Sequence, residues 1–222
     1  MEFKYITSKQ MSKVDKTAVK KYGLRIEQMM ENAGRNLANF TLKSKPKRVI
    51  ILYGKGNNGG GGLSAVRHLL IKGIKCIIVP ASKNPNKQVK QQLKILEKSK
   101  IKPSKFPKIK KGDIIIDALL GYNIKGNPRK KYKELIKLAN NSKAKIISLD
   151  IPSGTNPDTG EKYPPSINAN EVLTLALPKI GLKKIKNVYL ANIGIPSKVY
   201  SDLKIRVGDY FKNGDIIRVN AC

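Results

Sequence analysis

Residues 49–63 constrain the fold more than any other stretch of this 222-residue sequence. Five apolar residues end at Tyr53, a segment with six glycines and two asparagines follows, and a second apolar pattern begins at Leu63. A short β-prone run bounded by glycine is typical of a strand buried on both faces, as in a parallel sheet. The next apolar residues recur at helical spacing, and Gly73 is placed to end that helix. The stretch therefore predicts a strand, a glycine loop and a helix.

The glycines between this strand and helix indicate either a flexible turn or a phosphate-binding loop. Glycine adopts positive φ angles and lets a backbone approach a ligand closely. The start of the following helix offers unpaired N–H groups to an anion such as a pyrophosphate. The spacing fits neither the dinucleotide-binding fingerprint, which needs an acidic partner, nor a P-loop, whose final Gly-Lys-Ser/Thr is missing. The loop is a candidate phosphate cradle, with the flexible turn as the alternative.

Short apolar strands alternate with helical segments along the rest of the chain. Strands are predicted at residues 48–53, 75–80, 113–119, 145–150, 171–177 and 188–193, with two short ones at 204–207 and 216–219. Helices are predicted at residues 8–22 with a cap at Ser8, at 26–42, around 89–96, and from Asn127 onward. This order predicts a three-layer α/β/α sandwich, with a Rossmann-like, doubly wound, mostly parallel sheet and two N-terminal helices. We expect one domain, residues 1–222.

The net charge of +30 favours a polyanionic partner such as RNA or DNA when it is taken alone. However, the chain has 38 lysines and only seven arginines, whereas readout of phosphates and bases relies on the arginine fork. The basic residues are also scattered, and no zinc spacing or helix-turn-helix pattern accompanies them. We expect a lysine-rich surface that attracts anionic cofactors, with a nucleic-acid site as the alternative.

The sequence contains no apolar run of about 18 residues or more, so no membrane span is expected. Its first residues lack the apolar core of a secretory signal. Cys76 and Cys222 do not form a disulfide framework, which fits a reducing compartment. We therefore expect a cytoplasmic protein.

Polar residues follow several predicted strands, at the edge where ligands of open α/β sheets collect. Asp117 and Asp150 each close an apolar strand, and a carboxylate near a core needs a partner, a metal or a substrate proton. The alternative is that each caps backbone N–H groups. Asn58, Asp117 and Ser153 together would supply oxygen ligands for a hard cation. Lys179 is expected at the surface, with an electrostatic role as the alternative, and the only histidine, His68, is expected to be structural.

Six motifs in order along the chain resemble the NAD(P)H-hydrate epimerase family. They are residues 29–34 (MMENAG), 54–63 (GKGNNGGGGL), 117–121 (DALLG), 149–154 (LDIPSG), 178–181 (PKIG) and 192–196 (NIGIP). The resemblance covers about residues 5 to 200 and implies interconversion of the R and S forms of hydrated NADH or NADPH (NADHX and NADPHX). It also implies a homodimer, and a separate dehydratase as the pathway partner.

The resemblance further implies the residues of the site. One K⁺ per subunit would be bound by Asn58, Asp117 and Ser153. The hydrated nucleotide would contact Asn57, Asn58, Gly59, Gly60, Gly61, Gly121, Tyr122, Asn123, Ile124, Lys125, Gly126, Asn127 and Asp150. We hypothesise Asp150 as the general acid/base, because a hydroxyl that leaves and returns on a ring carbon needs a proton donor and acceptor.

Gly61 departs from the family pattern, which usually has Asp at this position. The loss of that carboxylate removes a charge and a hydrogen-bond acceptor from the expected pocket. The alternative function is therefore a catalytically weakened or inactive member of the family that binds a nucleotide or RNA.

Overall fold

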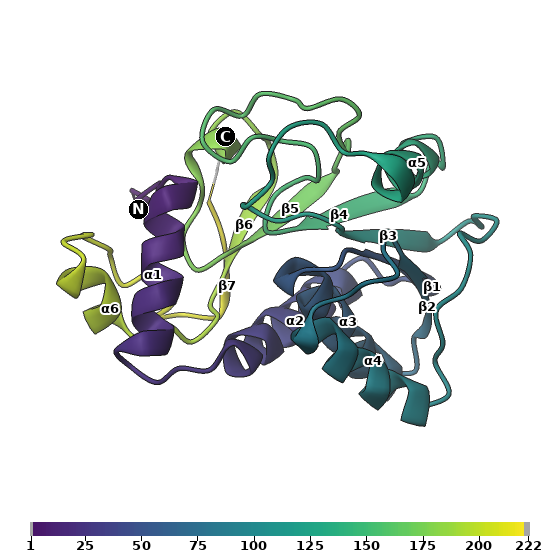
Figure 1. The fold of residues 1–222 in the computed structure, drawn as a ribbon, viewed down its shortest axis with the longest axis horizontal. Helices are drawn as coiled ribbons and strands as arrows, with labels where there is room; N and C mark the ends of the chain where they lie inside the picture. Colours follow the sequence, from purple (N-terminus) through teal and green to yellow (C-terminus); the bar gives the residue numbers. More distant parts are fainter. Residues whose placement is uncertain (1, 220–222) are drawn as a thin grey trace.

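The computed structural model describes residues 2–219, which form a seven-stranded sheet flanked by helices (Figure 1). The strands are β1 (Arg48–Tyr53), β2 (Lys75–Pro80), β3 (Asp113–Ala118), β4 (Lys145–Leu149), β5 (Glu171–Leu175), β6 (Val188–Ala191) and β7 (Ile216–Arg218). The helices are α1 (Ser8–Lys20), α2 (Ile26–Leu42), α3 (Asn57–Ile71), α4 (Lys87–Lys98), α5 (Lys130–Asn140), α6 (Ser197–Asp202) and the 3₁₀ turn η1 (Ile180–Leu182). Within residues 2–219, none of the helices is both long and apolar enough to cross a bilayer.

The strand order is β2-β1-β3-β4-β5-β6-β7, and every neighbouring pair is parallel except β6 and β7. The chain moves outward from β1 to β2 and then returns to the other side of β1 to form β3. The carboxyl ends of β1 and β3 therefore flank a topological switch point, where loops diverge and leave a crevice. This topology confirms the doubly wound, mostly parallel sheet that the sequence predicts.

The helices form a layer on each face of the sheet, as the predicted sandwich requires (Figure 1). On one face, apolar residues of α2, α3 and α4 share a core cluster with alternate residues of β1 and β3, such as Ile51 and Ile116. On the other face, α5 packs against Ile50 and Ile115. Residues of α1 and α6 share a third cluster with β5 and β6, including Val172. Successive side chains of a strand point to opposite faces of the sheet, so each strand contributes apolar residues to both helical layers.

The glycine segment is the main difference from the sequence-based expectation. It is predicted as a loop, but α3 begins at Asn57 and includes four consecutive glycines. These glycines do not have positive φ angles. Two of them permit close packing instead: a Cβ on Gly60 would lie 2.6 Å from Met30 Cε, and one on Gly62 would lie 2.5 Å from Ala118 Cβ. Tertiary packing overrides the poor helix propensity of glycine, which costs about 1 kcal/mol per residue.

Several predicted boundaries are also wrong. Thr7, not Ser8, caps α1, because its side chain accepts the Gln10 N–H while the Gln10 side chain accepts the Thr7 N–H. No strand forms at residues 204–207, where the Ile205 N–H bonds to Tyr200 O and closes the unpredicted helix α6. The strands β3 to β6 stop one or two residues earlier than predicted, and α5 starts at Lys130 rather than at residue 127.

Candidate active site

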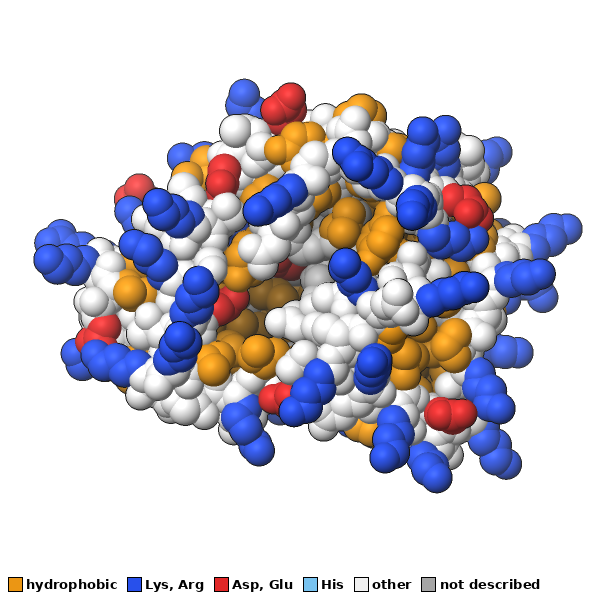
Figure 2. All heavy atoms as spheres, in the orientation of Figure 1, with side chains coloured by type: hydrophobic (Ala, Val, Ile, Leu, Met, Phe, Trp, Pro, Cys, Tyr) orange, Lys and Arg blue, Asp and Glu red, His pale blue; other side chains and the backbone are white. Residues whose placement is uncertain are grey.

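A cavity of about 730 Å³ opens at the switch point, beyond the carboxyl ends of β1, β3, β4 and β5. Its volume is in the range of small-molecule and cofactor sites. Its walls come from α1, α2, the start of α3, the segment after β3 and the residues that follow β4 and β5. Figure 2 shows a hollow on this face of the molecule with hydrophobic and acidic side chains inside it.

The first turn of α3 faces this cavity with two asparagines. Asn57 is exposed, and its Oδ1 accepts a hydrogen bond of 2.8 Å from Asn86, the residue that caps α4. Asn58 Nδ2 donates to Leu120 O at 3.1 Å and to Leu149 O at 3.2 Å. Asn58 therefore joins the segments after β3 and β4 to the start of α3. The unpaired N–H groups at the N-terminus of α3, together with the helix dipole, would stabilise an anionic ligand at this position.

Asp117 lies at the end of β3, and its side chain is completely buried. Its carboxylate accepts four hydrogen bonds: Ser153 Oγ (2.6 Å) and Leu119 N (3.2 Å) donate to Oδ1, and Ser153 N (2.9 Å) and Ser148 Oγ (2.8 Å) donate to Oδ2. Burial raises the pKa of Asp117, and these four hydrogen bonds oppose that rise. Ser153 Oγ in turn accepts the Leu120 N–H at 2.9 Å.

The oxygen atoms around Asn58 fit the K⁺ ion that the family resemblance implies. Asn58 Oδ1 is buried and has no hydrogen-bond partner among the described residues, which is costly unless a ligand satisfies it. Asn58 and Ser153 share the Leu120 backbone as a hydrogen-bond partner, and Ser153 contacts Asp117. A set of amide, hydroxyl and carbonyl oxygens with a single carboxylate suits a hard, weakly charged cation. Across residues 2–219, no cluster of three His, Cys, Asp or Glu side chains offers a site for a transition metal.

Asp150 follows β4 directly and has an unusual backbone conformation. Its φ angle is +69°, and the Ile151 N–H donates to Leu149 O at 2.9 Å, so Asp150 is the central residue of a γ-turn with positive φ. Such conformations cost about 1–3 kcal/mol and persist only where surrounding contacts enforce them. Here the Asp150 N–H donates to Leu173 O at 2.8 Å. The turn directs the Asp150 side chain to the cavity, which it lines.

Lys179 is the ion-pair partner of Asp150, and its predicted surface position is wrong. The lysine is 1% exposed and Asp150 is 4% exposed. Lys179 Nζ donates to Asp150 Oδ1 at 2.5 Å and to Leu175 O at 2.9 Å. The lysine lies in this position because the segment before η1 runs beside Ile6 as a short parallel bridge. The two side chains therefore form a buried, hydrogen-bonded ion pair, in which each charge has its partner.

Helix α1 forms one wall of the cavity and contributes Asp15, a residue that the sequence analysis does not identify. The Tyr122 hydroxyl donates to Asp15 Oδ2 at 2.5 Å, and the Tyr122 N–H donates to Asp150 Oδ2 at 3.1 Å. Lys179 Nζ also lies 5.6 Å from the centre of the Tyr122 ring. A polar residue on the inner face of a helix that is otherwise apolar at Met11, Val14 and Ala18 is the only sequence signal for Asp15.

The structure brings most of the expected substrate contacts to this cavity. Those that line it are Asn57, Asn58, Gly61, Gly121, Tyr122, Asn123, Ile124 and Asp150. Gly59 and Gly60 are buried in the first turns of α3, where they allow the helix to approach its neighbours. Lys125, Gly126 and Asn127 are exposed and lie outside the cavity lining.

The sequence family described as "YjeF-related protein N-terminus" matches residues 26–181, which contain the glycine segment, Asp117, Asp150 and Lys179. The chain belongs to this family. A solved structure with the same fold is the crystal structure of yeast ynu0, which is 24% identical and superposes with a TM-score of 0.86 over 97% of this chain and 99% of that one.

Relatives of this YjeF-related chain carry consistent names. A protein of Dehalogenimonas lykanthroporepellens is 39% identical over 88% of this chain and 84% of its own length, and one of Entamoeba histolytica is 32% identical over 97% and 99%. Both are named NAD(P)H-hydrate epimerase. A protein of Dictyoglomus turgidum named bifunctional NAD(P)H-hydrate repair enzyme Nnr is 32% identical over 97% of this chain but only 46% of its own length.

Gly61, where the family resemblance leads us to expect Asp, lies in the cavity wall. A Cβ at this position would lie 3.0 Å from Leu149 Cδ2 and 4.0 Å from Ala33 Cβ. The nearest atom is the flexible end of a leucine, so a longer side chain needs only a small movement of Leu149. Leu149 therefore has to move by a few tenths of an ångström before residue 61 can carry a Cβ.

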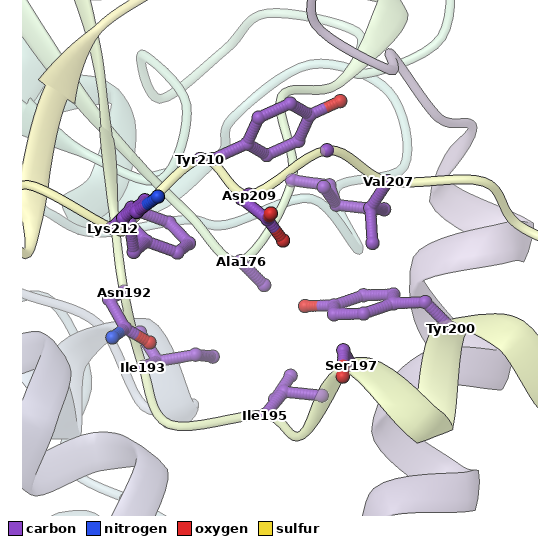
Figure 3. A pocket seen from close by; sticks show the side chains of 13 residues that line it. Ala176, Asn192, Ile193, Ile195, Ser197, Tyr200, Val207, Asp209, Tyr210 and Lys212 are labelled. Carbon is purple, nitrogen blue, oxygen red and sulfur yellow. The ribbon is translucent and has the colours of Figure 1, made fainter.

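A second, smaller cavity of about 380 Å³ lies beyond β6, between α6 and residues 207–212 (Figure 3). The hydroxyl of Tyr200 and the carboxylate of Asp209 point into it (Figure 3). Its lining includes Ile193, which also lines the larger cavity, but none of the residues that the sequence predicts for the site. We therefore place the candidate active site in the larger cavity.

The basic side chains surround the visible face rather than gathering in one patch (Figure 2). Lys16, Lys20 and Lys55 are exposed side chains that line the candidate site. His68 contacts Glu31 at 2.9 Å between α3 and α2, outside the lining of the cavity. The distribution fits the expected lysine-rich surface, with three lysines available to an anionic ligand.

Proposed function

We propose that this protein is an NAD(P)H-hydrate epimerase, which interconverts the R and S forms of NADHX and NADPHX. The main support for this proposal is a nucleotide-sized cavity beside the first turn of α3. In this cavity Lys179 and Tyr122 hold the Asp150 carboxylate through hydrogen bonds. The names of the relatives that align along most of this chain support the same activity.

In this proposal Asp150 exchanges a proton with the hydroxyl on the ring carbon next to the nicotinamide nitrogen. The N–H groups at the start of α3, together with Lys16, Lys20 and Lys55, bind the phosphates. Asn58, Asp117 and Ser153 hold one K⁺ per chain. When bound, this cation would balance the charge of Asp117 and join the segments after β3 and β4 to α3.

The assay starts from one epimer of NADPHX in a potassium buffer and follows its conversion by chromatography. The wild-type protein should equalise the R and S forms faster than the spontaneous reaction does, and Asp150→Asn should abolish the acceleration. Asparagine tolerates positive φ, so this variant keeps the turn at residue 150. A wild-type rate equal to the spontaneous rate would contradict the proposal.

A second candidate function is RNA binding without catalysis, which the net charge of +30 and Gly61 favour. It predicts salt-sensitive binding to RNA together with no epimerisation. The buried Asp150–Lys179 pair favours the enzyme, because a binding scaffold gains nothing from a strained, ion-paired carboxylate in its cavity. The homodimer, the single domain over residues 1–222 and a dehydratase as pathway partner remain predictions.

A further inference from the structure

Asp15 is a second carboxyl group in the cavity, and it comes from α1 rather than from a strand end. Its Oδ2 accepts the hydroxyl hydrogen of Tyr122 at 2.5 Å. No Lys, Arg or His side chain within residues 2–219 forms an ion pair with it. Burial raises the pKa of Asp15, and the negative charge of Asp150 adds to that rise, whereas the Tyr122 hydrogen bond and the more distant Lys179 charge oppose it.

The two carboxyl groups of the cavity lie in opposite environments. Asp150 forms a buried ion pair with the ammonium group of Lys179. Asp15 lacks such a partner and has a raised pKa, which favours its protonated form. The two groups contact opposite ends of Tyr122, since the N–H of this residue bonds to Asp150 and its hydroxyl bonds to Asp15. Paired carboxyl groups in contrasting environments are the usual arrangement of an acid and a base in one site.

Epimerisation of a hydroxylated carbon requires that water leaves one face of the ring and returns to the other. A single carboxyl group fixed on one side cannot reach both hydroxyl positions without movement of the ring. We infer that Asp15 is the second acid/base of this site and serves the face of the nicotinamide ring opposite Asp150. This inference rests on the proposed function and deepens it.

The step balances with one proton shared between the two groups. Protonated Asp15 donates its proton to the hydroxyl, the C–O bond breaks with its electron pair leaving in water, and the ring-nitrogen lone pair forms a C=N bond. A second water then attacks the carbon from the opposite face, the C=N electron pair returns to nitrogen, and Asp150 takes the proton released by that water. The reverse epimerisation starts from the resulting form, in which Asp150 is protonated and Asp15 is ionised. Before another forward turnover, Asp150 releases its proton to solvent water and Asp15 takes one up.

The groups that face Asp15 are consistent with this role. Tyr122 holds the carboxyl group in position from the segment after β3. Tyr200 of α6 lies close enough that the charge of Asp15 contributes to its raised pKa, and Lys179 and Asp150 face Asp15 from beyond the ends of β5 and β4. Because Tyr122 and Tyr200 both have raised pKa values through burial, neither removes the Asp15 proton near neutral pH.

The test compares Asp15→Asn, Asp15→Glu and the control Asp202→Asn, with epimerisation measured in both directions. Asparagine still accepts the Tyr122 hydroxyl hydrogen. Asp202 contacts Lys21 and Tyr22 beside the end of α1, so its variant reports the effect of loosening that helix. We expect Asp15→Asn to lower kcat by about 10²–10⁴-fold in both directions. Asp15→Glu should recover part of the lost kcat, and Asp202→Asn should keep the wild-type kcat.

The pH profile separates catalysis from structure. Activity requires one proton on the pair, so wild-type kcat should fall at high pH when this proton is lost, and the Asp15→Asn variant should lack that limb. The affinity of Asp15→Asn for NADP⁺ should stay at the wild-type value. If Asp15→Asn kept the kcat of the wild-type protein, or if Asp202→Asn lost as much kcat as Asp15→Asn, the inference about Asp15 would be overturned while the proposed function would stand. A wild-type protein without epimerase activity would overturn the proposed function and this inference with it.

Discussion

Replacement of Lys179 by methionine tests whether the buried ion pair is structurally essential to the site. Methionine keeps most of the length and apolar surface of the lysine stem but removes the ammonium group. In the native protein this group contacts Asp150 Oδ1 at 2.5 Å, with the two side chains 1% and 5% exposed. The variant therefore leaves a buried carboxylate without its cation, which costs about 3–5 kcal/mol of unfolding free energy.

The assay is urea unfolding followed by circular dichroism, with the m-value fitted for each variant. With a slope of about 3 kcal/mol/M, the expected loss lowers the unfolding midpoint by about 1–2 M. Lys21→Met is the matched control, because Lys21 pairs with Asp202 but is 65% exposed at its side chain, and such exposed pairs contribute about 0–1 kcal/mol. The double variant Asp150→Asn/Lys179→Met should lose less stability than Lys179→Met alone, since it no longer buries an unpaired charge.

A midpoint for Lys179→Met equal to that of Lys21→Met would contradict a structural requirement for the buried ion pair. It would mean that the buried pair contributes no more to stability than the exposed pair of Lys21 and Asp202. A double variant less stable than Lys179→Met would also contradict it.

Three further predictions address the glycines of α3, the cation and the core. Gly61→Asp should raise kcat if the missing carboxylate limits turnover, since the nearest atom to a new Cβ is the flexible end of Leu149. Gly61→Asn is the uncharged control. An unchanged kcat in Gly61→Asp would show that the missing carboxylate does not limit turnover. Ser153→Ala should raise the K⁺ concentration for half-maximal activity by about 10–100-fold, because it removes a proposed ligand oxygen and the hydrogen bond that Ser153 Oγ donates to Asp117. Ser142→Ala, just after α5, should leave that concentration unchanged. Burial raises the pKa of the Cys76 thiol to about 12, so iodoacetamide at pH 8 should leave this thiol unmodified until the protein is unfolded. Peptide mass spectrometry measures the modification, and rapid labelling of the native protein would contradict the burial of Cys76.

The sequence predicts the layers and the sheet well because short apolar strands and amphipathic helices leave strong periodic patterns. It misses the start of α3, since glycine signals a turn locally and only the neighbouring Met30 and Ala118 show that the residues are needed for close packing. It misplaces Lys179 for a related reason. Lysine is usually exposed, and the partner that permits its burial, Asp150, is 29 residues away in the sequence.

The candidate site shows the same division between local and tertiary signals. Asn58, Asp117, Asp150 and Ser153 follow or close strands, so the rule that ligands gather at strand ends is enough to suggest them. Asp15 is different because it lies on a helix that precedes the sheet. Its place in the cavity depends on how α1 is held, partly through the hydrogen bonds of Ser8 to Asp158, and no local pattern encodes that contact.

We propose that the nicotinamide ring binds at Asp150 in the cavity and that a monovalent cation binds beside it, at Asn58 and the buried Asp117 and Ser153. Diffraction from crystals grown in a thallium salt and soaked with NADP⁺ tests it most directly, since Tl⁺ replaces K⁺ and gives an anomalous signal. We expect an anomalous peak within bonding distance of the Asn58 and Ser153 oxygens, with the nicotinamide ring against the Asp150 carboxylate and the phosphates at the start of α3. A nicotinamide ring bound away from Asp150, or a Tl⁺ peak elsewhere with none beside Asn58, would contradict the account.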